Sequence, residues 1–177
     1  VDRRDRTYRE GDLVVATVES SRAGYLYLLY CDAESDVYAV FPNRYQQSNY
    51  VRANEKVVVP TDGSNFQLRI VKPFGTEVLK AIVTDKPIKT MSLPDLTKAD
   101  ATKLDVTTLR NAIKAMSVDG VDSLDPDDGR DIYDWAEHSV EVFTLPASAD
   151  RDIRQPKRFF FGAGISEYED KRIRNLT

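Results

Sequence analysis

The sequence has very little of two residue types on which many catalytic and metal sites depend. It contains one cysteine, Cys31, and one histidine, His138, among 177 residues. A single cysteine excludes a disulfide within the chain and the zinc sites that need two to four thiolates. A nucleophilic Cys–His pair is not expected, because Cys31 closes an apolar run where a free cysteine is normally a small hydrophobe. His138 is expected to be partly exposed at the boundary of an element.

Long hydrophobic runs and an excess of positive charge are also missing. No apolar run approaches the roughly 20 residues that span a bilayer. The 25 Lys and Arg residues are outnumbered by 29 Asp and Glu residues, which gives a net charge of −4. We therefore expect no membrane span and no nucleic-acid partner, since binding to nucleic acid needs clustered positive charge. The chain begins at Val1 without an apolar signal core, which predicts an excised fragment or a processed product, and no compartment is predicted.

The motifs of common enzyme classes are absent as well. The sequence has no nucleophile elbow, no phosphate-binding loop and no pair of catalytic carboxylates. Gly162-Ala163-Gly164 lacks the third glycine of a dinucleotide site. We expect no catalytic residues, no cofactor and no metal, and therefore no enzyme activity in this fragment.

What the sequence does have is a series of short apolar segments separated by turn signals. Six of them predict β-strands, at 13–18, 25–31, 37–41, 56–59, 66–70 and 77–83. Segments 25–31 and 37–41 read as a hairpin with a longer loop. In segment 66–70, Phe66, Leu68 and Ile70 are expected to point inward, while residues 67 and 69 face outward.

The pattern changes near residue 90. Apolar residues at helical spacing predict a helix over about 105–116, with Asp105 or Thr107 as its cap. A short second helix is predicted from Ile132, Tyr133, Trp135 and Ala136.

A seventh strand at 140–144 is expected to rejoin the sheet. Together these elements predict a mainly β fold, an Ig-like antiparallel β-sandwich with one or two short helices inserted before the last strand. The domain is expected to span residues 1–146, followed by a linker at 147–158 and a C-terminal segment at 159–177.

One loop combines aromatic, amide and guanidinium groups, which suit contact with a ligand. The candidate contact residues are Asn43, Arg44, Tyr45, Asn49 and Tyr50. The alternative is that the tyrosines only pack the loop onto the sandwich.

An acidic stretch follows the predicted helix. Calcium binds clustered carboxylates, but aligning an EF-hand on Gly129 places Leu124 and Pro126 at ligand positions. We expect a solvated acidic loop over residues 119–134, and cation binding there stays open.

Several short motifs occur in a fixed order along the first half of the chain. They are Tyr8-x-x-Gly11-Asp12, Gly24-Tyr25-Leu26-Tyr27-Leu28-Leu29, Phe41-Pro42-Asn43, Asn49, Val59-Pro60, Gly75-Thr76-Glu77 and Ala81-Ile82-Val83. This pattern resembles a bacterial family called domain of unknown function 4384, over about residues 8–90, with the whole domain taken as about 8–145. The resemblance implies an accessory module beside catalytic domains, including caspase-like peptidases, and supplies no catalytic residues.

The C-terminal segment carries a second resemblance. The run Phe159-Phe160-Phe161-Gly162-Ala163-Gly164-Ile165-Ser166-Glu167-Tyr168, followed by Ile173 and Leu176, resembles the opening strand of a bacterial caspase-like (C14-type) peptidase domain. This resemblance implies that the parent chain is a cysteine peptidase whose catalytic His and Cys lie downstream. Neither His138 nor Cys31 matches those positions.

The two resemblances together give the expected function. The fragment is expected to be a non-catalytic accessory domain that binds a partner or substrate for, or regulates, a caspase-like peptidase in the same polypeptide. The partner would be a protein or peptide, and the oligomeric state is open. The alternative is a cell-envelope or carbohydrate-binding module.

The linker generates a prediction of its own. Bacterial caspase-like enzymes commonly cut after basic residues, as the resemblance implies, and the linker carries Arg151, Arg154, Lys157 and Arg158. Because proteolysis concentrates in exposed linkers, we expect an active parent enzyme to cleave itself here. Intact mass spectrometry of the active parent checks this expectation, and an uncut linker would indicate a plain spacer.

Overall fold

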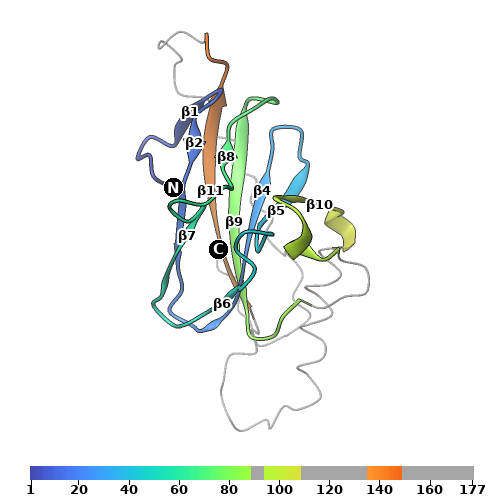
Figure 1. The fold of residues 1–177 in the computed structure, drawn as a ribbon. Coiled ribbons are helices and arrows are strands. Elements are labelled where there is room, and N and C mark those ends of the chain that lie inside the picture. The colour runs from blue at the N-terminus through green and yellow to red at the C-terminus, as the bar shows by residue number, and fades with distance from the viewer. Residues whose placement is uncertain (89–93, 109–134, 149–177) are drawn as a thin grey trace, which may run out of the picture.

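Figure 1 shows the computed structural model, which describes residues 1–88, 94–108 and 135–148. The large sheet contains β1 (Thr7–Arg9), β4 (Gly24–Cys31), β5 (Val37–Phe41), β6 (Tyr50–Val51), β9 (Thr76–Thr84), β10 (Thr102–Leu104) and β11 (Trp135–Leu145). Two smaller sheets pair β2 (Leu13–Val14) with β8 (Leu68–Arg69), and β3 (Ala16–Glu19) with β7 (Lys56–Val59). The predicted mainly β fold is confirmed.

The large sheet is open, with strand order β1-β11-β9-β4-β5-β10 and β6 paired to β4. Among the described strand pairs, only β1 and β11 run parallel. The predicted hairpin is formed by β4 and β5, with a register shift between Leu28 and Leu29. The last strand rejoins the sheet as expected, because β11 lies between β9 and β1.

Buried residues lie on both faces of the large sheet. The main cluster joins one face to the two small sheets, through residues such as Leu26, Leu28 and Leu79 on the sheet and Val14 and Val59 opposite. The second cluster lies on the other face and contains Tyr27, Leu29, Ala39, Ile82 and Leu104. This alternation follows from the period of two along each strand. The arrangement is a sandwich in which a seven-stranded sheet faces two two-stranded sheets.

The predicted strand at 13–18 is divided in two. Val15 separates β2 from β3, and both of its backbone groups bond to Asp2 rather than to a strand. The two halves consequently pair with different partners, β8 and β7. Segments 56–59 and 66–70 therefore do not pair with each other. The inward alternation predicted for 66–70 is confirmed, since Phe66 and Ile70 are buried and residues 67 and 69 are exposed.

The predicted second helix at 132–136 is wrong where the structure describes it. Trp135 and Ala136 are the first residues of β11, and Trp135 pairs with Thr84 of β9. The long ladder with β9 overrides the local spacing of apolar residues. Residues 132–134 lie outside the described residues.

The first predicted helix is seen only at its start. Residues 106–108 are helical, and Asp105 caps them by accepting hydrogen bonds from the N–H and hydroxyl of Thr108, both at 2.7 Å. The remainder of the predicted helix lies outside the described residues.

One 3₁₀ turn in the described part of the chain, Leu96–Lys98, was not predicted. In the described part of the chain, no helix has the length and apolar character needed to cross a bilayer.

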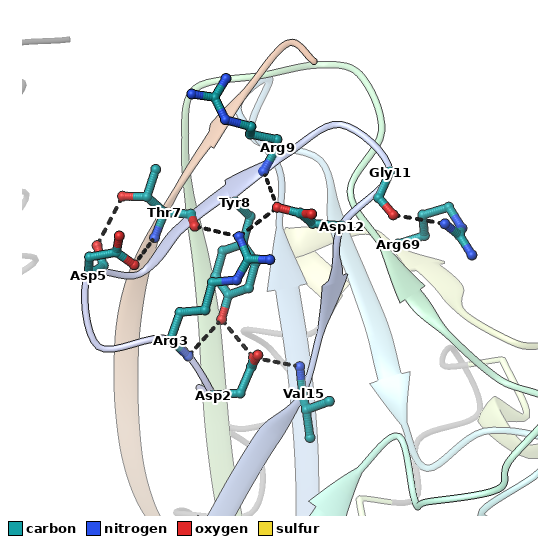
Figure 2. A network of polar contacts seen from close by, with 10 residues as sticks. All are labelled: Asp2, Arg3, Asp5, Thr7, Tyr8, Arg9, Gly11, Asp12, Val15 and Arg69. Carbon is teal, nitrogen blue, oxygen red and sulfur yellow. Dashed lines mark hydrogen bonds and ion pairs between the residues drawn. The ribbon is translucent and has the colours of Figure 1, made fainter. Parts of the chain in front are cut away.

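A network of polar contacts fixes the N-terminal segment against the small sheets (Figure 2). Asp2 Oδ1 accepts hydrogen bonds from the hydroxyl of Tyr8 at 2.8 Å and from the N–H of Val15 at 3.0 Å. Asp12 Oδ2 accepts from Arg3 at 2.6 Å and from the N–H of Arg9 at 2.7 Å. The ring of Tyr8 is fully buried at the centre of this network. Burial and the hydrogen bond to Asp2 raise the pKa of Tyr8 to about 12, so its hydroxyl stays a donor at neutral pH.

This network predicts a specific loss of stability. In Tyr8→Phe, Asp2 loses a hydrogen-bond donor that is specific to the folded state, and we expect the free energy of unfolding to fall by about 1–2 kcal/mol. Tyr38→Phe is the matched control, because the hydroxyl of Tyr38 forms no hydrogen bond within the described residues. Urea unfolding of both variants measures the difference. Equal midpoints for the two variants would contradict a stabilising role of the Tyr8 hydroxyl.

Candidate binding cleft

A cleft with a volume of about 590 Å³ opens between residues 65–73 and the inner face of the large sheet. Its floor is apolar and includes Tyr30 of β4, Tyr38 and Val40 of β5 and Leu79 of β9. The covering strands β2 and β8 are only two residues long, and β8 with the residues on either side of it forms one wall of the cleft. In Figure 1, β8 lies in front of the sheet, with β2 on one side and β10 on the other.

Charged side chains stand around this apolar floor. Asp32 and Asp100 line the cleft on the side of the large sheet, and Arg69 and Lys72 line it on the side of β8. Asp100 forms an ion pair with Arg44. Arg69 donates to two neutral acceptors, the carbonyl of Gly11 and the amide oxygen of Gln67, both at 2.8 Å. The rim on the β8 side therefore carries positive charge.

Part of the predicted contact loop lies at one end of the cleft. The N–H of Arg44 donates to the carbonyl of Ala99 at 2.9 Å, next to the ion pair with Asp100. The ring of Tyr45 stacks on Phe66, a residue of the cleft, with ring centroids 6.3 Å apart. Arg44 also lies over the Tyr45 ring at 5.0 Å from its centroid. These contacts hold two of the predicted residues at the rim.

The two asparagines of the predicted set hold the loop in shape. Asn43 is fully buried and donates to the carbonyl of Val40 at 2.8 Å. Its Oδ1 accepts from the N–H groups of Tyr45 and Gln46, both at 2.9 Å. Asn49 donates to the carbonyl of Leu26 at 3.1 Å. Both side-chain amides are therefore engaged with the backbone of the domain itself.

Tyr50 lies apart from the other predicted residues. It belongs to β6 and contacts Tyr25 of β4 edge-on, with ring centroids 5.3 Å apart. More than half of its surface is exposed, and neither tyrosine lines the cleft. The predicted set is thus divided into two residues at the cleft rim, two asparagines that hold the loop in shape and one tyrosine in a separate aromatic pair.

A buried carboxyl group stands behind the cleft. Glu77 of β9 is 1% exposed and accepts hydrogen bonds from the hydroxyl of Tyr30 and from Thr144 Oγ1, the latter at 2.9 Å. Thr144 Oγ1 in turn accepts from the N–H of Gly75 at 3.0 Å. Burial raises the pKa of Glu77, the two hydrogen bonds lower it in part, and the charge of Asp32 raises it further. Burial and the bond to Glu77 also raise the pKa of Tyr30.

This carboxyl group was missed as a site residue by sequence reasoning, which placed Glu77 only within a motif. The available signal was a single acidic residue in the otherwise apolar start of a strand, at Glu77-Val78-Leu79. The cleft residues Arg69 and Lys72 were also missed, because no local sequence pattern indicates that a cleft lies between residues 65–73 and the large sheet.

The single cysteine and the single histidine do not lie side by side. Cys31 pairs with Val78 and His138 pairs with Ala81, so the two residues lie on opposite sides of β9 and three residues apart along it. His138 is exposed within β11 rather than at its boundary.

No group of three or more potential metal ligands occurs among the described residues. The stretch 119–134 and the basic linker residues 151–158 lie outside the described part of the chain.

Comparison with known families supports the first resemblance. Residues 7–87 match the model of the family described as "Domain of unknown function (DUF4384)". The match runs from β1 through β9, and it includes Gly24, where an added Cβ would lie 2.6 Å from the carbonyl oxygen of Thr84. It also includes the buried side chains of Asn43 and Glu77.

The remaining comparisons add no relatives. No match was found among the curated proteins. No solved structure matches either. None of the comparisons shows the caspase-like domain that residues 159–177 predict.

The environment of Glu77 predicts a characteristic pH dependence. A carboxyl group with a raised pKa binds its proton more tightly in the folded state, so its contribution to stability falls as pH rises above about 4.5. In Glu77→Gln the amide oxygen can accept from Tyr30 and the amide N–H can donate to Thr144 Oγ1, whose hydroxyl can turn to the carbonyl of Gly75, but the side chain cannot ionise. We expect the variant to gain stability relative to the natural protein as pH rises above about 4.5, until Glu77 is ionised in the folded state as well.

Urea unfolding at several pH values measures this difference. The pKa values of Asp2 and Asp12 are lowered, and their opposite effect at lower pH cancels because both proteins carry them. Parallel stability profiles for the two proteins would show that Glu77 titrates normally.

Proposed function

We propose that this domain is a non-catalytic binding module that takes a protein or peptide partner into the cleft between residues 65–73 and the large sheet. The observation that carries the proposal is the cleft itself, with an apolar floor and charged side chains at its rim. Sites of this composition gain affinity from burying apolar surface and specificity from a few polar contacts. Arg44 and Tyr45 extend the rim and offer a guanidinium and an aromatic face to the same partner.

We also propose a place for this binding in a larger protein. The C-terminal segment resembles the start of a caspase-like peptidase domain, and a binding module before such a domain would recruit its substrate or regulate it. The partner in the cleft would then be a substrate segment or part of the peptidase domain in the same polypeptide. This part of the proposal is supported by the sequence resemblance at 159–177 alone.

A carbohydrate-binding or cell-envelope role is the second candidate. Tyr50 favours it, since an exposed ring with an edge-on neighbour is a surface on which a sugar ring can stack. Because Tyr50 and the cleft are separate, variants can distinguish the two candidates.

Three variants of the full chain test the proposal. Ala101→Trp places a large side chain in the cleft at an exposed position, and Ala101→Ser is its matched control. Tyr50→Ala removes the aromatic pair. We expect peptides selected from a random library to bind the natural protein, and the tryptophan variant to weaken this binding by about tenfold or more. Calorimetric titration measures the affinity.

The controls decide between the two candidates. The serine variant and Tyr50→Ala should bind the selected peptides with unchanged affinity. Glycan binding that disappears in Tyr50→Ala, together with the absence of any selected peptide, would favour the carbohydrate role and overturn the proposed one.

A further inference from the structure

Within residues 1–88, 94–108 and 135–148, the edge of β8 that faces away from β2 has backbone groups without partners. Ile70 directs both of its backbone groups toward the β2 side, donating to Asp12 and accepting from Gly11, both at 2.9 Å. Adjacent residues in an antiparallel strand point their N–H and C=O groups to alternate sides. The backbone groups of residues 67, 69 and 71 therefore point to the opposite side, and among the described residues none of them forms a backbone hydrogen bond there.

This open edge borders the cleft. Residues 65–73 all line the cleft, whereas Asp100 and Ala101 form the wall on the far side. Among the described residues no strand lies next to β8 on this side, where the half-buried ring of Tyr38 and the buried side chain of Val40 line the cleft. A strand inserted there would pair with β8 and cover this part of the floor.

The charges on the β8 side specify the partner further. Arg69 bonds only to neutral acceptors, and Lys72 has no ion-pair partner within the described residues. On the opposite wall, the charge of Asp100 is balanced by Arg44, and Asp32 accepts from the N–H groups of Glu34 and Asp36, both at 2.9 Å. An acidic partner would complement Lys72 and Arg69 on the β8 side of the cleft, where the guanidinium of Arg69 is directed toward Gly11 on the β2 side of the strand.

We propose that the cleft binds an extended acidic peptide segment of a partner by strand addition, in which the segment pairs with the free edge of β8 and completes the second layer of the sandwich. The inference rests on the proposed function and adds to it the mode of binding and the chemistry of the ligand. Main-chain hydrogen bonds to residues 67–71 would supply affinity, and alternate apolar side chains would contact the floor.

The probe is a peptide in which valine alternates with glutamate over about eight residues. Two further peptides carry N-methyl groups on either the valines or the glutamates, which blocks the N–H groups on one side of the strand at a time. A fourth peptide replaces glutamate with lysine. Calorimetry with the full chain should show that one N-methylated peptide loses about tenfold or more in affinity and that the other does not. The lysine peptide should bind at least about tenfold more weakly.

A protein variant provides the complementary test. Val71→Pro removes an edge N–H that has no partner in the described part of the chain, and the residue lies outside the ladder with β2. Proline is tolerated at such edge positions. We expect weaker binding by Val71→Pro and unchanged binding by its control, Val71→Thr. The N-methylated peptides give an answer even if the proline variant does not fold.

The outcomes separate the two proposals. Binding that Ala101→Trp abolishes but that neither N-methylated peptide changes would overturn strand addition and leave the proposed function in place. Equal binding of the lysine peptide would overturn the acidic specificity. No binding by any peptide in the set or from the random library would overturn both proposals. A dimer in sedimentation experiments that Val71→Pro dissociates would show that the edge pairs with a second copy, and would overturn the peptide partner.

Discussion

The organisation of this domain depends on the unequal size of the two layers that share its core. In the part of the chain that the structure describes, a seven-stranded sheet presents an apolar face, and the opposite layer consists of two sheets with two strands each. Apolar residues of the large sheet are well covered where Val14 and Val59 lie opposite them. Toward β5 the cover is thinner, because Val40 is still buried but Tyr38 is only half-buried, and the cleft lies there. Burial of apolar surface drives the sandwich together, so the same deficit that leaves the cleft open makes it a place where further burial is favourable.

Polar contacts compensate for the shortness of the covering strands. The Asp2–Tyr8–Val15 contacts and the Asp12–Arg3–Arg9 contacts tie the N-terminal segment to the start of the second layer. Behind the cleft, Glu77 joins β4, β9 and β11 through Tyr30 and Thr144, with its hydrogen bonds satisfied. These groups hold the floor and its cover in fixed positions, and a preformed cleft reduces the conformational entropy that the protein must lose on binding a ligand.

Sequence patterns were sufficient for the long elements and insufficient for the short ones. The hairpin of β4 and β5, the strand at 56–59 and the inward face of Phe66 and Ile70 follow from period-two alternation and turn residues. β1, β6 and β10 have two or three residues each and show no periodicity. Trp135 and Ala136 have apolar spacing that fits a helix, but pairing with β9 determines their conformation. In the predicted loop, residue type indicated surface contact, whereas the amides of Asn43 and Asn49 bond to their own domain. Arg44 and Tyr45 reach the cleft rim because the fold brings this loop next to Asp100 and Phe66, and a local sequence pattern cannot predict such a contact.

Amide hydrogen exchange of the free protein, measured residue by residue by NMR, tests the open edge most directly. Protection depends on hydrogen bonding and burial of each N–H group. The account predicts slow exchange at Ile70, whose N–H donates to Asp12, and fast exchange at Gln67, Arg69 and Val71 on the free edge. Protection of these three amides to the same extent as Ile70 would mean that the edge is already paired in the free protein, and would contradict an unfilled second layer.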